Sequence, residues 1–205
     1  MSDSVGGSRW DGTLHHDAKI MNGSLVLDKT DDYRNFTTGS HASLPNGALG
    51  NSSSISFEMW VDIDQDNKDF CKLFQFGDPL QNCPSAHCFR MKNTGFLCCA
   101  LCSGGWNGIC TDQVFNGSKL HFIYSIDPSG VNTIYVNGEA IVSKVQNQMI
   151  PGRRSQDILL LGAAPVLDDY TLWGSIHEFR IWNGIFRESA ARVSYQIGPD
   201  HVNNR

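Results

Sequence analysis

Hydrophobic and polar residues alternate with a period of two along many short segments of this chain. Near the C-terminus, His177, Phe179 and Ile181 alternate with their neighbours in the way that is typical of a β-strand. Clusters of Gly, Asn, Asp, Ser and Pro separate these segments and predict turns. The predicted strands are 24–28, 55–63, 71–77, 87–92, 95–101, 119–127, 132–137, 139–145, 157–162 and 174–182. Such regular short strands predict an all-β fold, an antiparallel two-sheet sandwich.

Two local patterns refine this prediction. The strand at 132–137 runs into Asn137-Gly138, the pair that best tolerates the positive φ angles of a type I′ hairpin turn. Between 186 and 197, Ala190, Val193 and Ile197 fall on one helical face, which predicts a short C-terminal helix. No repeat or linker interrupts the pattern, so we expect one domain over residues 1–205.

Composition narrows the class of protein. The net charge is −5 and the pI is about 5.7, so the chain lacks the basic surface that nucleic acids or anionic membranes attract. No apolar run approaches the roughly 20 residues that a spanning helix requires. Residues 1–7 lack the basic and apolar regions of a signal peptide, which favours a mature or excised domain.

The cysteines favour a disulfide-bonded protein. All seven fall in one window: Cys71, Cys83, Cys88, Cys98, Cys99, Cys102 and Cys110. Neighbouring side chains on a strand point to opposite faces, so the adjacent pair Cys98 and Cys99 is expected to find different partners. Candidate pairs are Cys102 with Cys110, Cys83 with Cys88, and Cys71 with either member of the adjacent pair. An odd number leaves one thiol free, buried or bonded to another chain.

A zinc site is the alternative for this window. It would use Cys99-x-x-Cys102 with His87, Cys88 or Cys110, but only one such Cys-x-x-Cys pair occurs, so disulfides are favoured. Four glycosylation sequons lie in turn-rich segments, at Asn22, Asn35, Asn51 and Asn116. Dense cysteines together with these sequons favour a glycoprotein that is secreted or exposed at the cell surface.

Four segments resemble one known family. They are 24–33 (Ser-Leu-Val-Leu-Asp followed by Asp-Asp-Tyr), 55–61 (Ile-Ser-Phe-Glu-Met-Trp-Val), 133–139 (Thr-Ile-Tyr-Val-Asn-Gly-Glu) and 174–183 (Gly-Ser-Ile-His-Glu-Phe-Arg-Ile-Trp-Asn). In this order they resemble the concanavalin A-like lectin/glucanase superfamily, in particular its laminin-G-like and pentraxin-like domains. The resemblance implies a jelly-roll sandwich that recognises ligands. Family members often begin with a strand before the segment that corresponds to residues 3–7. Either that strand has been trimmed from a longer protein, or the sheet edge is left for something else to cover.

The resemblance to pentraxins also implies a calcium site, the one cofactor we consider. Its ligands would come from two loops, the first with Asp78, Gln81 and Asn82 and the second with Asp168 and Asp169. The second loop carries fewer acidic residues than the family pattern. A separate acidic run at 62–69 is not an EF-hand, because Asn67 and Leu73 stand where that loop needs Gly and Glu, so we expect a solvated turn there.

The superfamily includes glycoside hydrolases, so the sequence is examined for a catalytic pair of carboxyl groups. Glu58, Trp60 and Asp62 project from one face of a predicted strand. Two carboxyl groups four residues apart on a strand are separated by about 13 Å, whereas glycoside hydrolysis needs roughly 5–9.5 Å. The hydrolases' Glu-x-Asp-x-x-Glu pattern is absent, and no His-x-x-x-His or Gly-x-Ser-x-Gly motif occurs. We therefore predict that the protein is not an enzyme.

The function predicted from the sequence is an extracellular module that binds a glycan or a protein through its rim loops. Trp106 with Asn107, and Tyr170 near the second acidic loop, are the candidate ligand-binding residues, whereas Trp60 and Trp182 are expected in the core. One alternative is a structural or adhesive subunit that joins a copy or partner chain through the odd cysteine or an edge strand. The other is a glycan-cleaving enzyme on the same fold.

Overall fold

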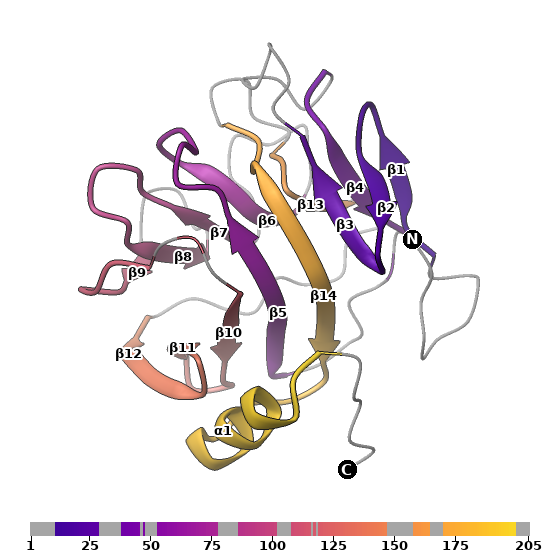
Figure 1. Cartoon of the computed structure of the whole chain (residues 1–205). Helices are drawn as coiled ribbons and strands as arrows, with labels where there is room; N and C mark the ends of the chain where they lie inside the picture. The colour runs from indigo at the N-terminus through magenta and orange to yellow at the C-terminus, as the bar shows by residue number, and fades with distance from the viewer. Residues whose placement is uncertain are drawn as a thin grey trace.

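Two antiparallel sheets, each with seven described strands, face each other as a jelly-roll sandwich (Figure 1). The computed structural model describes residues 11–28, 38–45, 47, 53–77, 86–101, 108–115, 117, 119–146, 158–164 and 170–199. The first sheet, sheet A, has the order β1 (Thr13–His15), β4 (His41–Leu44), β13 (Ile158–Leu161), β6 (Cys71–Gly77), β7 (Ala86–Arg90), β8 (Leu97–Leu101) and β9 (Gly108–Cys110). The second, sheet B, has the order β12 (Glu139–Val145), β11 (Val131–Val136), β10 (Leu120–Ile126), β5 (Ile55–Ile63), β14 (Gly174–Trp182), β3 (Ser24–Leu27) and β2 (Lys19–Met21). The helix α1 (Glu188–Ile197) follows β14.

The core lies between the two sheets and follows from the alternation in the sequence. Along the central strand β5, Phe57, Met59, Val61 and Ile63 are buried and pack against the facing sheet, for example against Phe74 of β6. The intervening residues of β5, among them Glu58 and Asp62, therefore point to the outer face of sheet B.

The strand pattern predicts most of this architecture. Strands β5, β6, β12 and β14 begin and end where the sequence predicts, and six others agree to within two residues at either end. The sequence missed β1, β2, β4 and β9, which have three or four residues each and are too short to show alternation. Among the described residues, no helix is long and apolar enough to cross a membrane.

The predicted hairpin turn is confirmed and helps to place α1. Asn137 has φ +51° and Gly138 has φ +83°. A Cβ atom on Gly138 would lie 2.8 Å from the Cα atom of Arg192, because the helix packs directly over this turn. The Asn137 side chain also accepts a hydrogen bond from the backbone N–H of His121, at 3.1 Å, which ties the turn to β10.

The disulfides differ from the predicted pairs. Cys88 is bonded to Cys99 and Cys98 to Cys110, so the adjacent cysteines do have different partners, on opposite faces of β8. The pairing follows the strand register, which sets Cys88 opposite Cys99 and Cys98 opposite Cys110, with Cα separations of 4.2 and 4.1 Å. The proposed pairs of Cys83 with Cys88 and of Cys102 with Cys110 are therefore wrong, and Cys83 and Cys102 themselves lie outside the described residues. The zinc alternative is also wrong, because three of its candidate ligands (Cys88, Cys99 and Cys110) are oxidised.

Cys71 is not a disulfide partner, contrary to the prediction. It is a free thiol in the core on β6, where burial raises its pKa to about 12. A thiol that is buried and protonated does not react readily. Cys71 is therefore not placed to bond to another chain.

Candidate functional site

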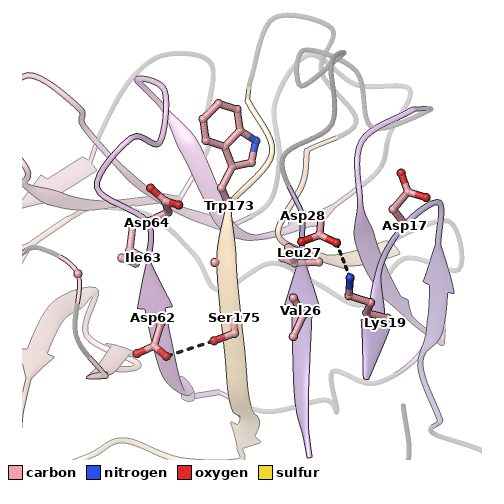
Figure 2. A pocket seen from close by; sticks show the side chains of 12 residues that line it. Asp17, Lys19, Val26, Leu27, Asp28, Asp62, Ile63, Asp64, Trp173 and Ser175 are labelled. Carbon is pink, nitrogen blue, oxygen red and sulfur yellow. Dashed lines mark hydrogen bonds and ion pairs between the residues drawn. The ribbon is translucent and has the colours of Figure 1, made fainter. Parts of the chain in front are cut away.

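The outer face of sheet B is divided into two regions. The helix α1 covers the end of the sheet where β14 finishes (Figure 1), and its Ala191 packs with Ile123 and Tyr135. At the other end, where β14 begins, an open pocket of about 880 Å³ lies over the sheet (Figure 2). Strand β5 contributes to both regions, with Glu58 beneath α1 and Asp62 in the pocket.

We call this cavity the outer-face pocket. Its lining mixes polar and apolar residues, its charged groups are four aspartates and one lysine, and residues far apart in the sequence meet there. They are Asp17, Lys19, Val26, Leu27, Asp28, Asp62, Ile63, Asp64, Gly117, Trp173, Gly174 and Ser175. On the β2 side of the pocket, the Lys19 ammonium and the Asp28 carboxylate form an ion pair of 2.6 Å, and both side chains are about half exposed.

Asp62 is held by a chain of hydrogen bonds that crosses three neighbouring strands. Its Oδ2 atom lies 2.7 Å from His177 Nε2 and accepts a hydrogen bond from the Ser175 hydroxyl at 3.2 Å. The other ring nitrogen of His177, Nδ1, lies 2.7 Å from the Ser24 hydroxyl on β3. Because His177 and Ser175 both contact Oδ2, the carboxylate is oriented before any ligand arrives, and within the described residues Oδ1 makes no such contact.

A buried asparagine fixes the rim of the pocket. The Asn67 amide donates to the carbonyl oxygens of Asp64 at 2.8 Å and Trp173 at 2.6 Å, and its Oδ1 accepts from the Trp173 N–H at 2.7 Å. These hydrogen bonds join the segment that follows β5 to the segment that precedes β14. The Lys68 ammonium lies 5.9 Å from the centre of the Trp173 ring. The acidic run that begins at Asp62 is thus a turn, as predicted, with Asp64 Oδ1 accepting from the Asp66 N–H at 2.8 Å.

Glu58 is fully buried and all of its hydrogen bonds are internal. Oε1 accepts from the Ser194 hydroxyl of α1 at 2.5 Å and lies 2.8 Å from His121 Nε2, while Oε2 accepts from the Trp182 indole N–H at 2.7 Å. Burial alone would raise the pKa of Glu58. The hydrogen bonds from His121, Ser194 and Trp182 outweigh burial and hold the pKa of Glu58 below its ordinary value.

Arg180 extends this network along β14. Its guanidinium makes two hydrogen bonds to Glu178, at 2.7 and 2.8 Å, and approaches Glu58 Oε2 at 3.4 Å. It also lies 4.6 Å from the centre of the Trp60 ring. Glu58 is therefore engaged in binding α1 to sheet B, and it does not form with Asp62 the pair of accessible carboxyl groups that glycoside hydrolysis uses.

Few of the site residues that the sequence suggested lie in the part of the chain that the structure describes. Tyr170 is half-buried and packs against the core, and its carbonyl oxygen accepts from the Lys72 N–H at 3.0 Å. The remaining candidates lie outside the described residues: Trp106, Asn107, Asp78, Gln81, Asn82, Asp168 and Asp169. Asn22 is exposed in the turn between β2 and β3 with φ +50°. The other sequons, at Asn35, Asn51 and Asn116, are not among the described residues, and glycosylation stays a prediction.

Sequence reasoning missed the outer-face pocket. It placed Asp62 on the correct face of its strand but found no partner for it. His177 lies 115 residues from Asp62 along the chain, and Ser24 lies 153 residues from His177. The alternating pattern groups His177 with Phe179 and Ile181, which pack against the core. A register shift between Ile176 and Glu178 turns His177 to the outer face instead, so the sequence held no signal of this contact.

The sequence places the chain in a known class of proteins. Residues 36–190 match the concanavalin A-like lectin/glucanases superfamily, which is more than half of the chain. The chain therefore belongs to this superfamily, as its motifs predicted. No characterised protein was similar enough in sequence to count as a match.

Solved structures share the fold at low sequence identity. The chain is similar to the botulinum neurotoxin serotype D binding domain (TM-score 0.66, 12% identity, 91% of this chain and 46% of that one). It is also similar to the binding domain of botulinum neurotoxin DC in complex with rat synaptotagmin II (TM-score 0.67, 13% identity, 92% and 47%). A third similar structure is the Trypanosoma rangeli sialidase in complex with the inhibitor DANA (TM-score 0.65, 15% identity, 91% and 29%). The chain spans less than half of each of these proteins, so they establish the fold alone.

Proposed function

We propose that the protein is a non-catalytic recognition module that binds a glycan or protein ligand in the outer-face pocket. The observation that carries this proposal is the oriented Asp62 carboxylate in an open cavity of about 880 Å³. A carboxylate that is already positioned loses little conformational freedom on binding and accepts hydrogen bonds from hydroxyl or N–H groups of a ligand. Binding domains among the structural neighbours support this class of function.

The arrangement of carboxyl groups favours binding over catalysis. Glycoside hydrolysis needs an acid and a second carboxylate on either side of the same bond. Glu58 has no exposed surface, and its oxygens are bonded to His121, Ser194 and Trp182. Asp62 is thus the member of the pair that a ligand reaches.

We further propose that the module works outside the cell. Two disulfides join β7, β8 and β9, and disulfides persist mainly in oxidising compartments.

The predicted calcium site at Asp78, Asn82, Asp168 and Asp169 is a separate proposal. Calcium at millimolar concentration should raise the melting temperature of the protein and EDTA should lower it. An unchanged melting temperature would refute the calcium site.

The binding proposal is tested by replacing Asp62. Asp62→Asn keeps the shape of the side chain and removes its charge, and we expect at least a tenfold loss of affinity for whichever ligand a glycan array or an extracellular protein panel identifies. Asp112→Asn makes the same charge change at an exposed residue that does not line the pocket, and should leave the affinity unchanged. Equal affinities for Asp62→Asn and the unmodified protein would refute the pocket as the binding site.

A further inference from the structure

A serine, a histidine and a carboxylate lie in line across the outer face of sheet B. Ser24 on β3, His177 on β14 and Asp62 on β5 come from three neighbouring strands. The Ser24 hydroxyl lies 2.7 Å from His177 Nδ1, and His177 Nε2 lies 2.7 Å from Asp62 Oδ2. We call Ser24, His177 and Asp62 the outer-face triad, because a nucleophile, a base and a group that orients the base are recognised by such contacts and not by sequence order.

The hydrogen bonds of the outer-face triad fix the direction in which the proton of Ser24 can move. An ionised carboxylate only accepts hydrogen bonds, so His177 Nε2 carries the hydrogen that it donates to Asp62. In the neutral ring, Nδ1 then carries no hydrogen and accepts the hydrogen bond from the Ser24 hydroxyl. Asp62 therefore orients His177 as a base for Ser24.

A β-bulge places the histidine between its two partners. The register of β14 against β5 shifts between Ile176 and Glu178, and His177 is the extra residue. Bulges of this kind redirect a side chain and are frequent next to active sites. The side chains of His177 and Asp62 are 15% and 34% exposed, and Ser24 is half-buried. Each member of the outer-face triad thus retains access to solvent.

We propose that Ser24 is a nucleophile that accepts an acyl group from a carboxylic ester. Its Oγ atom attacks the carbonyl carbon of the ester, and the hydroxyl proton passes to His177 Nδ1. The bond from that carbon to the alcohol oxygen breaks, and the departing alcohol takes the proton from Nδ1. The products are the acyl ester of Ser24 and a free alcohol. Acylation is one covalent step without turnover, so it goes beyond the recognition function and does not depend on it.

Acetylation of the unmodified protein by p-nitrophenyl acetate tests the nucleophile. Mass spectrometry of peptides after an acid quench should find an acetyl group on Ser24. Ser129 is the control serine in the same molecule. It is exposed and its hydroxyl lies 2.6 Å from Asp127 Oδ1, but no histidine lies within hydrogen-bond distance of it in the part of the chain that the structure describes.

The two serines differ in the base that faces them. We expect Ser24 to be acetylated at least roughly 100-fold faster than Ser129, because a positioned general base accelerates proton removal by about that factor or more. A ratio below about tenfold, or no acetyl group on Ser24, would overturn the proposal.

A conservative variant separates the basicity of His177 from its hydrogen bonds. In His177→Gln, the amide can still donate to Asp62 and accept from Ser24, but it takes up no proton. Acetylation of Ser24 should therefore slow by roughly 100-fold. His16→Gln makes the same change at an exposed histidine next to β1 of the other sheet, and should leave the rate unchanged.

An undiminished rate in His177→Gln would rule out His177 as the base and with it the outer-face triad. Should that variant fail to fold, the comparison of Ser24 with Ser129 in the unmodified protein decides alone.

Discussion

Glu58 shows how one buried charge holds the helix to the sheet. Its carboxylate has no exposed surface and accepts hydrogen bonds from α1, β10 and β14. A buried charge of this kind is tolerated only because each of its oxygens is satisfied. The same carboxylate that looked catalytic from the strand pattern is therefore a structural anchor for α1.

Replacing Glu58 by Gln tests this anchor. We expect Glu58→Gln to lower the free energy of unfolding at pH 7 by about 3 kcal/mol, because a buried network loses its ionised acceptor. The pKa of Glu58 is lowered by folding, so its stabilisation is fully present above about pH 4.5 and is lost as the pH falls further. Urea unfolding at pH 7, 5 and 3.5 should show the two proteins converging in acid. A constant difference at all three pH values would contradict the assignment, and the exposed control Glu188→Gln should change stability by less than about 0.5 kcal/mol.

Gly174 lines the outer-face pocket at the start of β14, close to the backbone of β5. Its φ angle is +147°, and a Cβ atom there would lie 2.0 Å from the carbonyl oxygen of Asp62. Gly184 has nearly the same φ angle, +151°, but a Cβ atom there would meet nothing within 4 Å. An alanine at either position would thus meet the same backbone strain, but only at Gly174 would its methyl group also clash with a neighbouring strand.

This contrast gives a matched pair of substitutions. Gly184→Ala should cost about 1 kcal/mol from backbone strain alone. Gly174→Ala should cost at least about 2 kcal/mol more, because β5 and β14 must separate to admit the methyl group. Thermal or urea unfolding measures both. Equal losses would mean that the contact with Asp62 relaxes easily.

At the scale of elements, the sequence predicts the long strands, whose alternating pattern repeats, and misses the short strands. Alternation over seven to nine residues defines β5, β6, β12 and β14, since a long strand has room to show its period. The strand β2 has three exposed residues and no buried face, so no pattern marks it. The disulfide pairing could not be predicted from the sequence for a different reason. It depends on which strands are neighbours and in which register, and the cysteine spacing contains neither.

The two disulfides offer a comparison at nearly constant loop length. The bonded residues are separated by 11 positions in Cys88–Cys99 and by 12 in Cys98–Cys110, so the restriction of the unfolded chain, worth about 3 kcal/mol, is nearly equal. Cys88 and Cys99 lie in the core, whereas Cys98 and Cys110 lie on the opposite face of sheet A and Cys110 is half-buried. Replacing the first pair by Ala should cost about 1–2 kcal/mol more than replacing the second, because it also leaves a cavity. Urea unfolding under non-reducing conditions decides, and a larger loss from the second pair would contradict this account.

At the scale of the whole molecule, the fold was predictable and the site was not. Four motifs and the strand pattern were enough for the two-sheet jelly roll, because burial of alternate residues is a local signal that every strand repeats. The outer-face pocket depends instead on the order β5, β14, β3 and β2 in sheet B. That order brings Ser24, Asp62 and His177 together, and no local pattern encodes it.

Strand β3 completes the sandwich, although the family match begins only at residue 36. Leu25 and Leu27 are each 2% exposed, and a Cβ atom on Gly162 of the facing sheet would lie 2.2 Å from Leu27 Cδ1, so the packing here is tight. Leu27→Ala should therefore lower the free energy of unfolding by about 3 kcal/mol. Its neighbour Val26 points outward and lines the pocket, and Val26→Ala should cost less than about 1 kcal/mol. Urea unfolding of the two variants measures the difference. If Leu27→Ala were as mild as Val26→Ala, β3 would contribute little to the core. The jelly roll would then be stable without the strand that carries Ser24 and leads into Asp28 of the outer-face pocket.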